Sequence, residues 1–170
     1  MEFHQIVLVV TLYGAGIAAG VFFTFTAVVI PGLMDMDHRA SLKGFQAIDG
    51  RLQPNASSIN WQPVFGAAIF GTGFLTVATL ILGWQHFSTT GRTLGVAATT
   101  AYNLGVWLPT FGSILPFNNR VRDLDLDAMS PAVLTTVHRD FERNWRGWNL
   151  VRSASSALAF ALLMAVVVTQ

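Results

Sequence analysis

Polar side chains at the two ends of one stretch, residues 117–152, are the best candidates for chemistry in an otherwise apolar chain. Arg152 falls just inside the last apolar run, where a guanidinium is costly unless it has a partner. Trp145, Asn149 and Arg152 recur at helical spacing, which places them on one helix face. Such a set of donors could hold an anion at the mouth of a helix bundle. A structural clamp between helix ends explains it equally well.

The sequence allows more than one partner for Arg152. Carboxylates such as Asp140 and Glu142 are near in the sequence. The side-chain oxygens of Asn118 and Asn119, which follow the preceding apolar run, are brought near if the chain reverses between the two runs.

Histidines suggest a second kind of chemistry. His138 and Glu142 are four residues apart on a predicted helix, a spacing compatible with metal ligation, and His38 would complete a two-histidine, one-carboxylate set. An unmetallated general base at His138 is at least as well supported, and a solvated helix face is better supported than either. We therefore predict no metal as the main interpretation. His4 and His86, near the other side, are more typical of interfacial residues than of ligands.

The composition predicts a multi-pass membrane protein. Hydrophobic residues make up 52% of the 170 residues and charged residues only 11%, against about 25% in soluble proteins. The net charge of +1, without a basic cluster, gives no indication of nucleic-acid binding. The absence of cysteine excludes disulfides and thiolate chemistry.

The predicted fold is all-α, a single membrane domain over residues 1–170 with four transmembrane helices. The spans are expected at about 6–30, 64–84, 94–115 and 150–168. Pro31 and Gly32 are predicted to end the first span. Each long connection, 31–63 and 116–149, is expected to contain a short amphipathic helix, the first capped by Asp37 and ending before Pro54, the second separated from the last span by a bend at Gly147.

The charge distribution predicts the orientation. One side has only Arg92, whereas the side with the long connections carries Arg39, Lys43, Arg51, Arg120, Arg122, Arg139, Arg143, Arg146 and Arg152. The positive-inside rule places the long connections in the cytoplasm. Gly16 and Gly20 form a small-xxx-small spacing, which we expect to serve packing within one bundle rather than a dimer face; the oligomeric state is open.

Common catalytic and nucleotide-binding motifs are absent. The chain has no Gly-x-Gly-x-x-Gly, no Walker loop, no His-Glu-x-x-His and no Gly-x-Ser-x-Gly. No charge lies in the middle of a predicted span, which argues against a proton-coupled transporter.

Several segments together resemble the anthrone oxygenase-like family of small four-helix membrane proteins. They are Pro31 after the first span, Phe-Gln-Ala-Ile-Asp at 45–49, Pro-Phe-Asn-Asn-Arg at 116–120, and Trp-x-x-x-Asn-x-x-Arg at 145–152. The most specific feature is the pairing of the last two. The likeness extends over nearly the whole chain.

The resemblance implies an integral-membrane oxidoreductase, a monooxygenase that uses O₂ without flavin or haem on a lipophilic anthrone-like or quinone-like molecule. His138 or a nearby carboxylate would be the base, and Trp145 and Trp148 would stack on the substrate. The remaining contacts would come from Gln46, Asn118, Asn119, Arg120, Asn149 and Arg152. Two alternatives remain: a non-catalytic binder or carrier of a lipophilic ligand, and a structural or accessory membrane protein.

Overall fold

The computed structural model describes residues 1–52 and 62–169, and within these ranges the protein is helical and contains no strand. Pro54 and Trp61 lie outside the described residues. Three of the helical rods are long and apolar enough to cross a membrane, Phe3–Met34, Gln62–Gly83 and Pro131–Val168. Large apolar side chains such as Phe23, Phe74 and Leu158 are exposed on their outer faces. These faces indicate a membrane protein, because water would not solvate them.

The sequence predicted that the first helix ends at Pro31, and this prediction is wrong, because the helical rod continues to Met34. α1 (Phe3–Thr24) passes through the π-helical turn η1 (Phe25–Val29) into α2 (Ile30–Met34), with Pro31 in the first turn of α2. Proline lacks the backbone donor that a helix interior needs, but a first turn does not need it. The wider turn η1 lets the helix restart at Ile30, so that the rod continues through the proline.

The connection after the first rod contains the amphipathic helix α3 (His38–Gly50). The carboxylate of Asp37 caps it by accepting from the backbone N–H groups of Arg39 and Ala40, each at 3.1 Å. Leu42 and Phe45 on its inner face are fully buried. The cap and the apolar spacing fix where this helix begins and which face it turns to the bundle.

The middle of the chain forms two adjacent rods. The first consists of α4 (Gln62–Gly66), η2 (Ala67–Gly71) and α5 (Thr72–Gly83). The second consists of α6 (Thr89–Tyr102), η3 (Asn103–Trp107), η4 (Thr110–Ile114) and α7 (Leu115–Arg122). Pro109 lies between two π-helical turns, which accommodate its missing donor. The predicted span 94–115 is helical but less apolar than the other three rods, so four membrane crossings remain a prediction.

The last rod is a single helix, α8 (Pro131–Val168). The sequence predicted a separate amphipathic helix before the last span, with a bend at Gly147. Instead helical structure continues on both sides of Gly147, where a Cβ would meet nothing within 4 Å. A glycine inside a helix lowers the stability of the helix by only about 1 kcal/mol relative to alanine, and the turns on both sides of Gly147 offset this loss.

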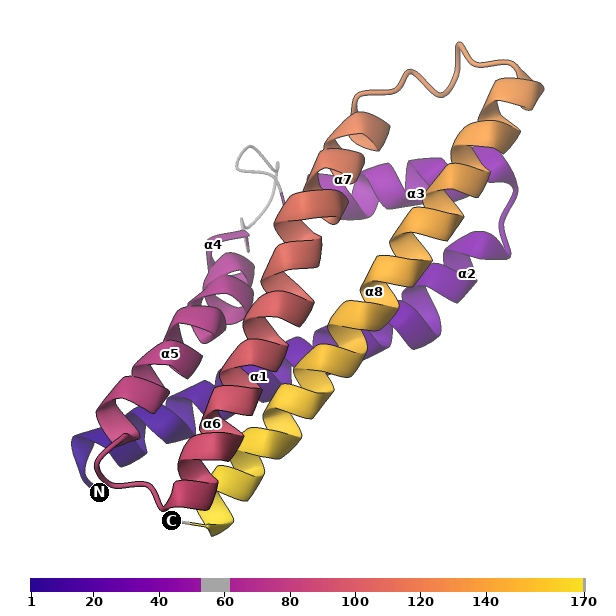
Figure 1. Cartoon of the computed structure of the whole chain (residues 1–170). Helices are drawn as coiled ribbons and strands as arrows, with labels where there is room; N and C mark the ends of the chain where they lie inside the picture. The colour runs from indigo at the N-terminus through magenta and orange to yellow at the C-terminus, as the bar shows by residue number, and fades with distance from the viewer. Residues whose placement is uncertain (53–61, 170) are drawn as a thin grey trace.

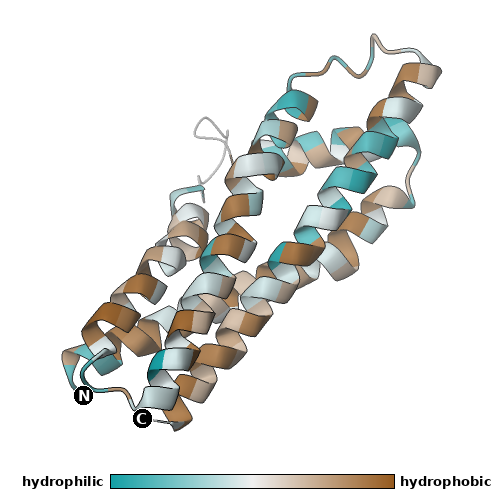
Figure 2. Cartoon of the chain, in the orientation of Figure 1, coloured by the Kyte–Doolittle hydropathy of each residue, from teal (hydrophilic) through white to brown (hydrophobic). Residues whose placement is uncertain are grey.

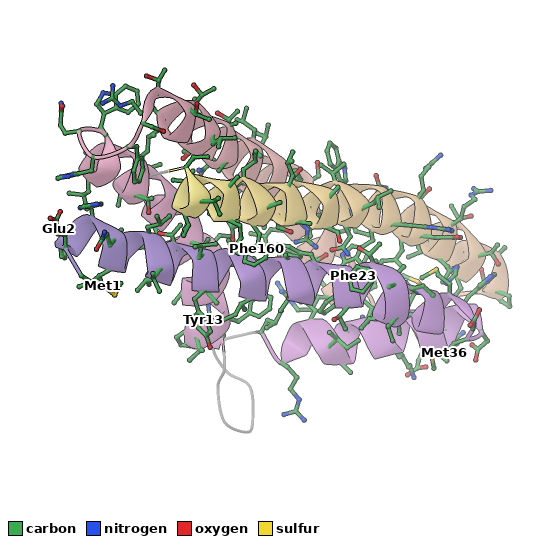
Figure 3. All side chains as sticks on the ribbon, turned by 90° about the horizontal axis from the view of Figure 1, so that it is seen from below. Met1, Glu2, Tyr13, Phe23, Met36 and Phe160 are labelled. Atoms are coloured by element: carbon green, nitrogen blue, oxygen red, sulfur yellow. The ribbon has the colours of Figure 1, made fainter. Side chains whose placement is uncertain are left out.

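The rods pack around α8, which lies against both α1 and α6, while α5 covers α1 and α6 from another side. Figure 1 shows both termini and the α5–α6 turn at one end of the molecule, with α3 and the α7–α8 connection at the other. Hydrophilic residues are concentrated at this second end (Figure 2). A Cβ built on Gly16 would lie 3.3 Å from the ring of Phe160, whereas one on Gly20 would meet nothing within 4 Å, so Gly16 serves internal packing. Figure 3 labels Phe160 between α8 and α1.

Charged side chains join α3 to the α7–α8 connection. Asp127 forms ion pairs with Lys43 at 2.7 Å and with Arg39 at 3.3 Å. The hydrogen bond from Lys43 and its charge hold the pKa of Asp127 below the usual range of an aspartate. Because these ion pairs are exposed to solvent, they add little to the stability of the fold. Their main effect is to position the α7–α8 connection against α3.

Candidate functional site

A cavity of about 390 Å³ lies between the helices at the end that carries α3. Its size falls in the range of small-molecule sites. The wall is mostly aromatic and aliphatic, with a few polar groups, and is formed by Val21, Phe22, Phe25, Phe45, Ile48, Asp49, Leu52, Gln62, Phe65, Gly66, Ile69, Phe70, Thr110, Ile114, Leu115, Asn118, Asn119, Trp145 and Arg152.

The π-helical turns contribute directly to this wall. Phe25 belongs to η1, Phe70 to η2 and Thr110 to η4. A π turn inserts an extra residue and rotates the side chains that follow it, and such turns are frequent at functional sites. Three helices therefore depart from regular geometry where they meet the cavity.

One face of α8 supplies the polar side of the site, as its spacing predicted. Phe141, Trp145, Asn149, Arg152 and Ser156 are all buried, with exposed fractions between 0% and 8%. Trp145 and Arg152 line the cavity, and Asn149 lies behind them.

Arg152 is a buried cation without a carboxylate partner among the described residues. Its Nη2 donates to Oδ1 of Asn149, its guanidinium lies 4.5 Å from the centre of the Phe22 ring, and its Nε has no hydrogen-bond partner. The sequence-based candidates Asp140 and Glu142 are wrong as partners, since they pair with Arg143 at 2.9 Å and Arg146 at 3.4 Å. The charge of Arg152 is therefore left uncompensated at the cavity wall.

Asn149 orients this cation. Its amide nitrogen donates to Thr26 Oγ1 at 2.8 Å and to the carbonyl oxygen of Phe22 at 3.3 Å. With the nitrogen fixed in this way, the amide oxygen must point toward Arg152, where it accepts the guanidinium bond.

A second polar chain crosses the cavity from α8 to α3. The indole Nε1 of Trp145 donates to Asn118 Oδ1 at 2.7 Å, and Asn118 Nδ2 donates to Asp49 Oδ1 at 3.2 Å. The other carboxylate oxygen of Asp49 accepts from Arg122 Nη1 at 3.2 Å. Asn118 thus bonds to Trp145 and Asp49, so Asn149 is the asparagine that meets Arg152.

Asp49 is the functional candidate that the sequence-based site omitted. It is 5% exposed and is the carboxylate among the described residues of the cavity wall. It lies four residues after Phe45 and seven after Leu42, an acid on the apolar face of α3. This spacing is the feature of the sequence from which a buried carboxylate could have been predicted.

Several predicted site residues lie away from the cavity wall. His138 is buried but bonds to Ser41 Oγ at 3.1 Å, and it precedes Arg152 by fourteen residues, roughly 21 Å along a helix. Gln46 donates to carbonyl oxygens at the end of α7, including Val121 O at 3.0 Å. Arg120 is exposed and Trp148 is 39% exposed, and neither lines the cavity. Asn119 lines the cavity from an exposed position.

The alternative metal set is brought together only in part. The rings of His38 and His138 stack with centroids 4.5 Å apart. Among the described residues, however, the set of three ligand atoms that converges is a different one, Glu2, His4 and His86 at the other end of the molecule. Glu142 bonds to Arg146 instead.

Comparison with known proteins agrees with the resemblance seen in the sequence. The family model described as Anthrone oxygenase matches residues 61–162, which is more than half of the chain and includes Asn118, Trp145, Asn149 and Arg152. No curated protein and no solved structure gives a significant match. The chain therefore belongs to the anthrone oxygenase family.

Proposed function

We propose that the protein is a membrane oxygenase that oxidises a flat, lipophilic, anthrone-like molecule in the cavity beneath α3. The observation that carries the proposal is the buried Arg152, which has no carboxylate partner among the described residues and lies on a mostly aromatic and aliphatic wall. A buried cation is costly unless something repays that cost. An anion formed from the substrate is the partner that such a site favours.

The reaction follows from carbon-acid chemistry. Removal of a proton from the methylene carbon of an anthrone gives an enolate-like anion, whose oxygen Arg152 would stabilise. The anion gives electrons to O₂ and forms a carbon–oxygen bond. The resulting hydroperoxide loses water and leaves the second carbonyl. One oxygen atom enters the quinone, the other leaves as water, and the substrate supplies the electrons.

The proposed roles follow the positions of the side chains. Asp49 takes the place of His138 as the base, since it is the carboxylate of the described cavity wall. Asn149 holds Arg152 in position through its amide oxygen. Trp145, with rings such as Phe45 and Phe25 close to it, provides the surface on which a planar substrate would stack.

Incubation of the purified protein with an anthrone under ¹⁸O₂ tests the proposal. We expect quinone formation well above the buffer rate, with one labelled oxygen atom in each product molecule. We expect R152Q to lose about 100-fold or more in kcat, as for removal of an anion-stabilising donor. R146Q, which removes an exposed charge on the same helix, should retain the wild-type rate.

Turnover no faster than the buffer control would contradict this substrate class. A ligand that copurifies with the protein in detergent, without oxygen consumption, would instead assign the cavity to a binder or carrier.

A further inference from the structure

Three side chains with metal-binding atoms converge at the end of the molecule opposite the cavity. Glu2 caps the start of α1, His4 lies in its first turn, and His86 lies in the turn between α5 and α6. Figure 3 shows Glu2 at the outer end of α1, far from Met36, which follows the other end of the same rod. Residues far apart in the sequence thus form one cluster.

The distances suit a divalent transition metal. One donor atom from each residue lies within 4.8 Å of the others. Oε2 of Glu2 lies 3.3 Å from Nδ1 of His4 and 3.9 Å from Nδ1 of His86. Donors around tetrahedral zinc are about 3.3 Å apart, as bonds of 2.0–2.1 Å require. Of the three donor pairs, Glu2–His4 already has this spacing and Glu2–His86 needs a shift of about half an ångström. The nitrogens of His4 and His86 lie within 4.8 Å of each other and would also have to approach.

We infer that Glu2, His4 and His86 bind a divalent first-row transition metal ion such as Zn²⁺. Two imidazoles and one carboxylate form a set that these ions prefer over Mg²⁺ or Ca²⁺. The three protein ligands leave a fourth position for water.

The surrounding structure holds one ligand and leaves the others accessible. The side chain of His4 is only 9% exposed and meets the edge of the buried Phe87 ring, with centroids 6.4 Å apart. Backbone bonds of 2.9 Å and 2.8 Å from His86 and Phe87 to the carbonyl oxygen of Gly83 fix the turn. The side chains of His86 and Glu2 are 51% and 69% exposed. An ion can therefore reach a site whose inner ligand is already in place.

Ion binding requires one defined rearrangement. The rings of His4 and His86 are stacked, with centroids 4.0 Å apart and planes 7° from parallel. A metal lies close to the plane of each imidazole that binds it, so two stacked rings cannot bind the same ion. The exposed ring of His86 has the room to rotate, whereas the ring of His4 does not.

The metal would link the start of α1 to the α5–α6 turn. It would stabilise the end of the bundle that carries the termini. It would not take part in reactions at the cavity, because the cavity lies at the opposite end. Metal binding should therefore raise the melting temperature without altering turnover.

The test uses protein purified through a tag without histidine, with Co²⁺ as a spectroscopic substitute for Zn²⁺. Wild type should bind one equivalent of Co²⁺ and show the strong visible bands of a four-coordinate ion. Zn²⁺ should displace it and raise the apparent melting temperature by several degrees. E2Q and H86N, both at exposed positions, should each weaken binding at least about tenfold, because even outer-shell changes cost that much.

H38N is the matched control. His38 also stacks on a histidine, but its Nδ1 bonds to Thr135 Oγ1 at 3.1 Å, and within residues 1–52 and 62–169 no third ligand converges there. H38N should bind Co²⁺ as wild type does. The inference fails if wild type gives only the weak absorption of the hydrated ion, or if E2Q and H86N bind as tightly as wild type.

Discussion

At the scale of single residues, the energy of burying Arg152 distinguishes a functional site from a structural clamp. A buried cation without a counter-charge costs several kcal/mol. Its hydrogen bond to Asn149 and its contact with Phe22 offset that cost by about 1–3 and about 1–2 kcal/mol. The terms nearly cancel. The stability of the fold therefore does not account for Arg152, and the proposed anion does.

The substitution R152M tests this balance. Methionine fills much of the same volume without charge, so we expect a melting temperature in detergent close to that of wild type, together with loss of turnover. The measurement is thermal unfolding followed by circular dichroism beside the anthrone assay. A loss of about 3–5 kcal/mol, as for a broken buried ion pair, would assign Arg152 to a clamp.

Asp49 gives a prediction for the proton-transfer step. D49N keeps the shape of the side chain and an acceptor oxygen for Arg122, but it removes the basic carboxylate. We expect kcat with an anthrone to fall by about 10²- to 10⁴-fold, the usual contribution of a positioned base.

The matched control for that step is D127N, which removes an aspartate that is also ion-paired but lies outside the cavity. It should leave kcat near the wild-type value. Equal activity of D49N and wild type would exclude Asp49 as the base and reopen the search along the cavity wall.

Sequence spacing predicted which side chains share the buried face of α8 because helical periodicity is local. Trp145, Asn149 and Arg152 need only a regular helix to share a face. The same regularity argues against His138, since fourteen residues of one straight helix keep it far from Arg152. The spacing of Asp49 after Leu42 and Phe45 places it on the apolar face of α3, but no local pattern encodes where that face docks on the bundle, and so Asp49 was missed.

At the scale of the elements, the cavity depends on helices that are irregular where they meet it. The sequence predicted apolar helices where the three long apolar rods lie, but not the π-helical turns within the helices. Pro31 was predicted to end the first span, whereas the helix continues through both Pro31 and Pro109 with π-helical turns nearby. Whether a proline ends a helix depends on tertiary contacts that can satisfy the freed backbone groups.

Gly105 marks a close approach between η3 and α8. A Cβ built there overlaps the Oγ and Cβ of Ser155 and lies 3.7 Å from its Cα, so the two helices would have to separate. We expect G105A to destabilise the protein by about 1–3 kcal/mol, the usual cost of overpacking. Thermal unfolding in detergent measures the change.

Gly112 provides the matched position on the same rod. A Cβ there meets nothing within 4 Å. G112A should be neutral or stabilise by up to about 1 kcal/mol through helix propensity. If both variants unfold at the wild-type temperature, the close contact between η3 and α8 does not exist in the detergent-solubilised protein.

At the scale of the whole molecule, two different groups of polar residues lie at opposite ends of an apolar bundle. The cavity with Arg152 and Asp49 is at the end with α3, and the cluster of Glu2, His4 and His86 is at the end with the termini. The positive-inside rule predicts that the α3 end faces the cytoplasm. On that orientation, substrate would reach the cavity from the cytoplasm or the bilayer, and metal would come from the opposite compartment.

Single-cysteine labelling tests that orientation directly, because the chain has no cysteine of its own. Ala128 in the α7–α8 connection and Thr90 near the α5–α6 turn are both exposed and lie at opposite ends. In intact cells, a membrane-impermeant maleimide should label T90C but not A128C until the membrane is permeabilised. The reverse pattern would invert the orientation. Labelling of both positions before permeabilisation would show that the two ends are not separated by the bilayer, and a membrane-spanning bundle would then be wrong.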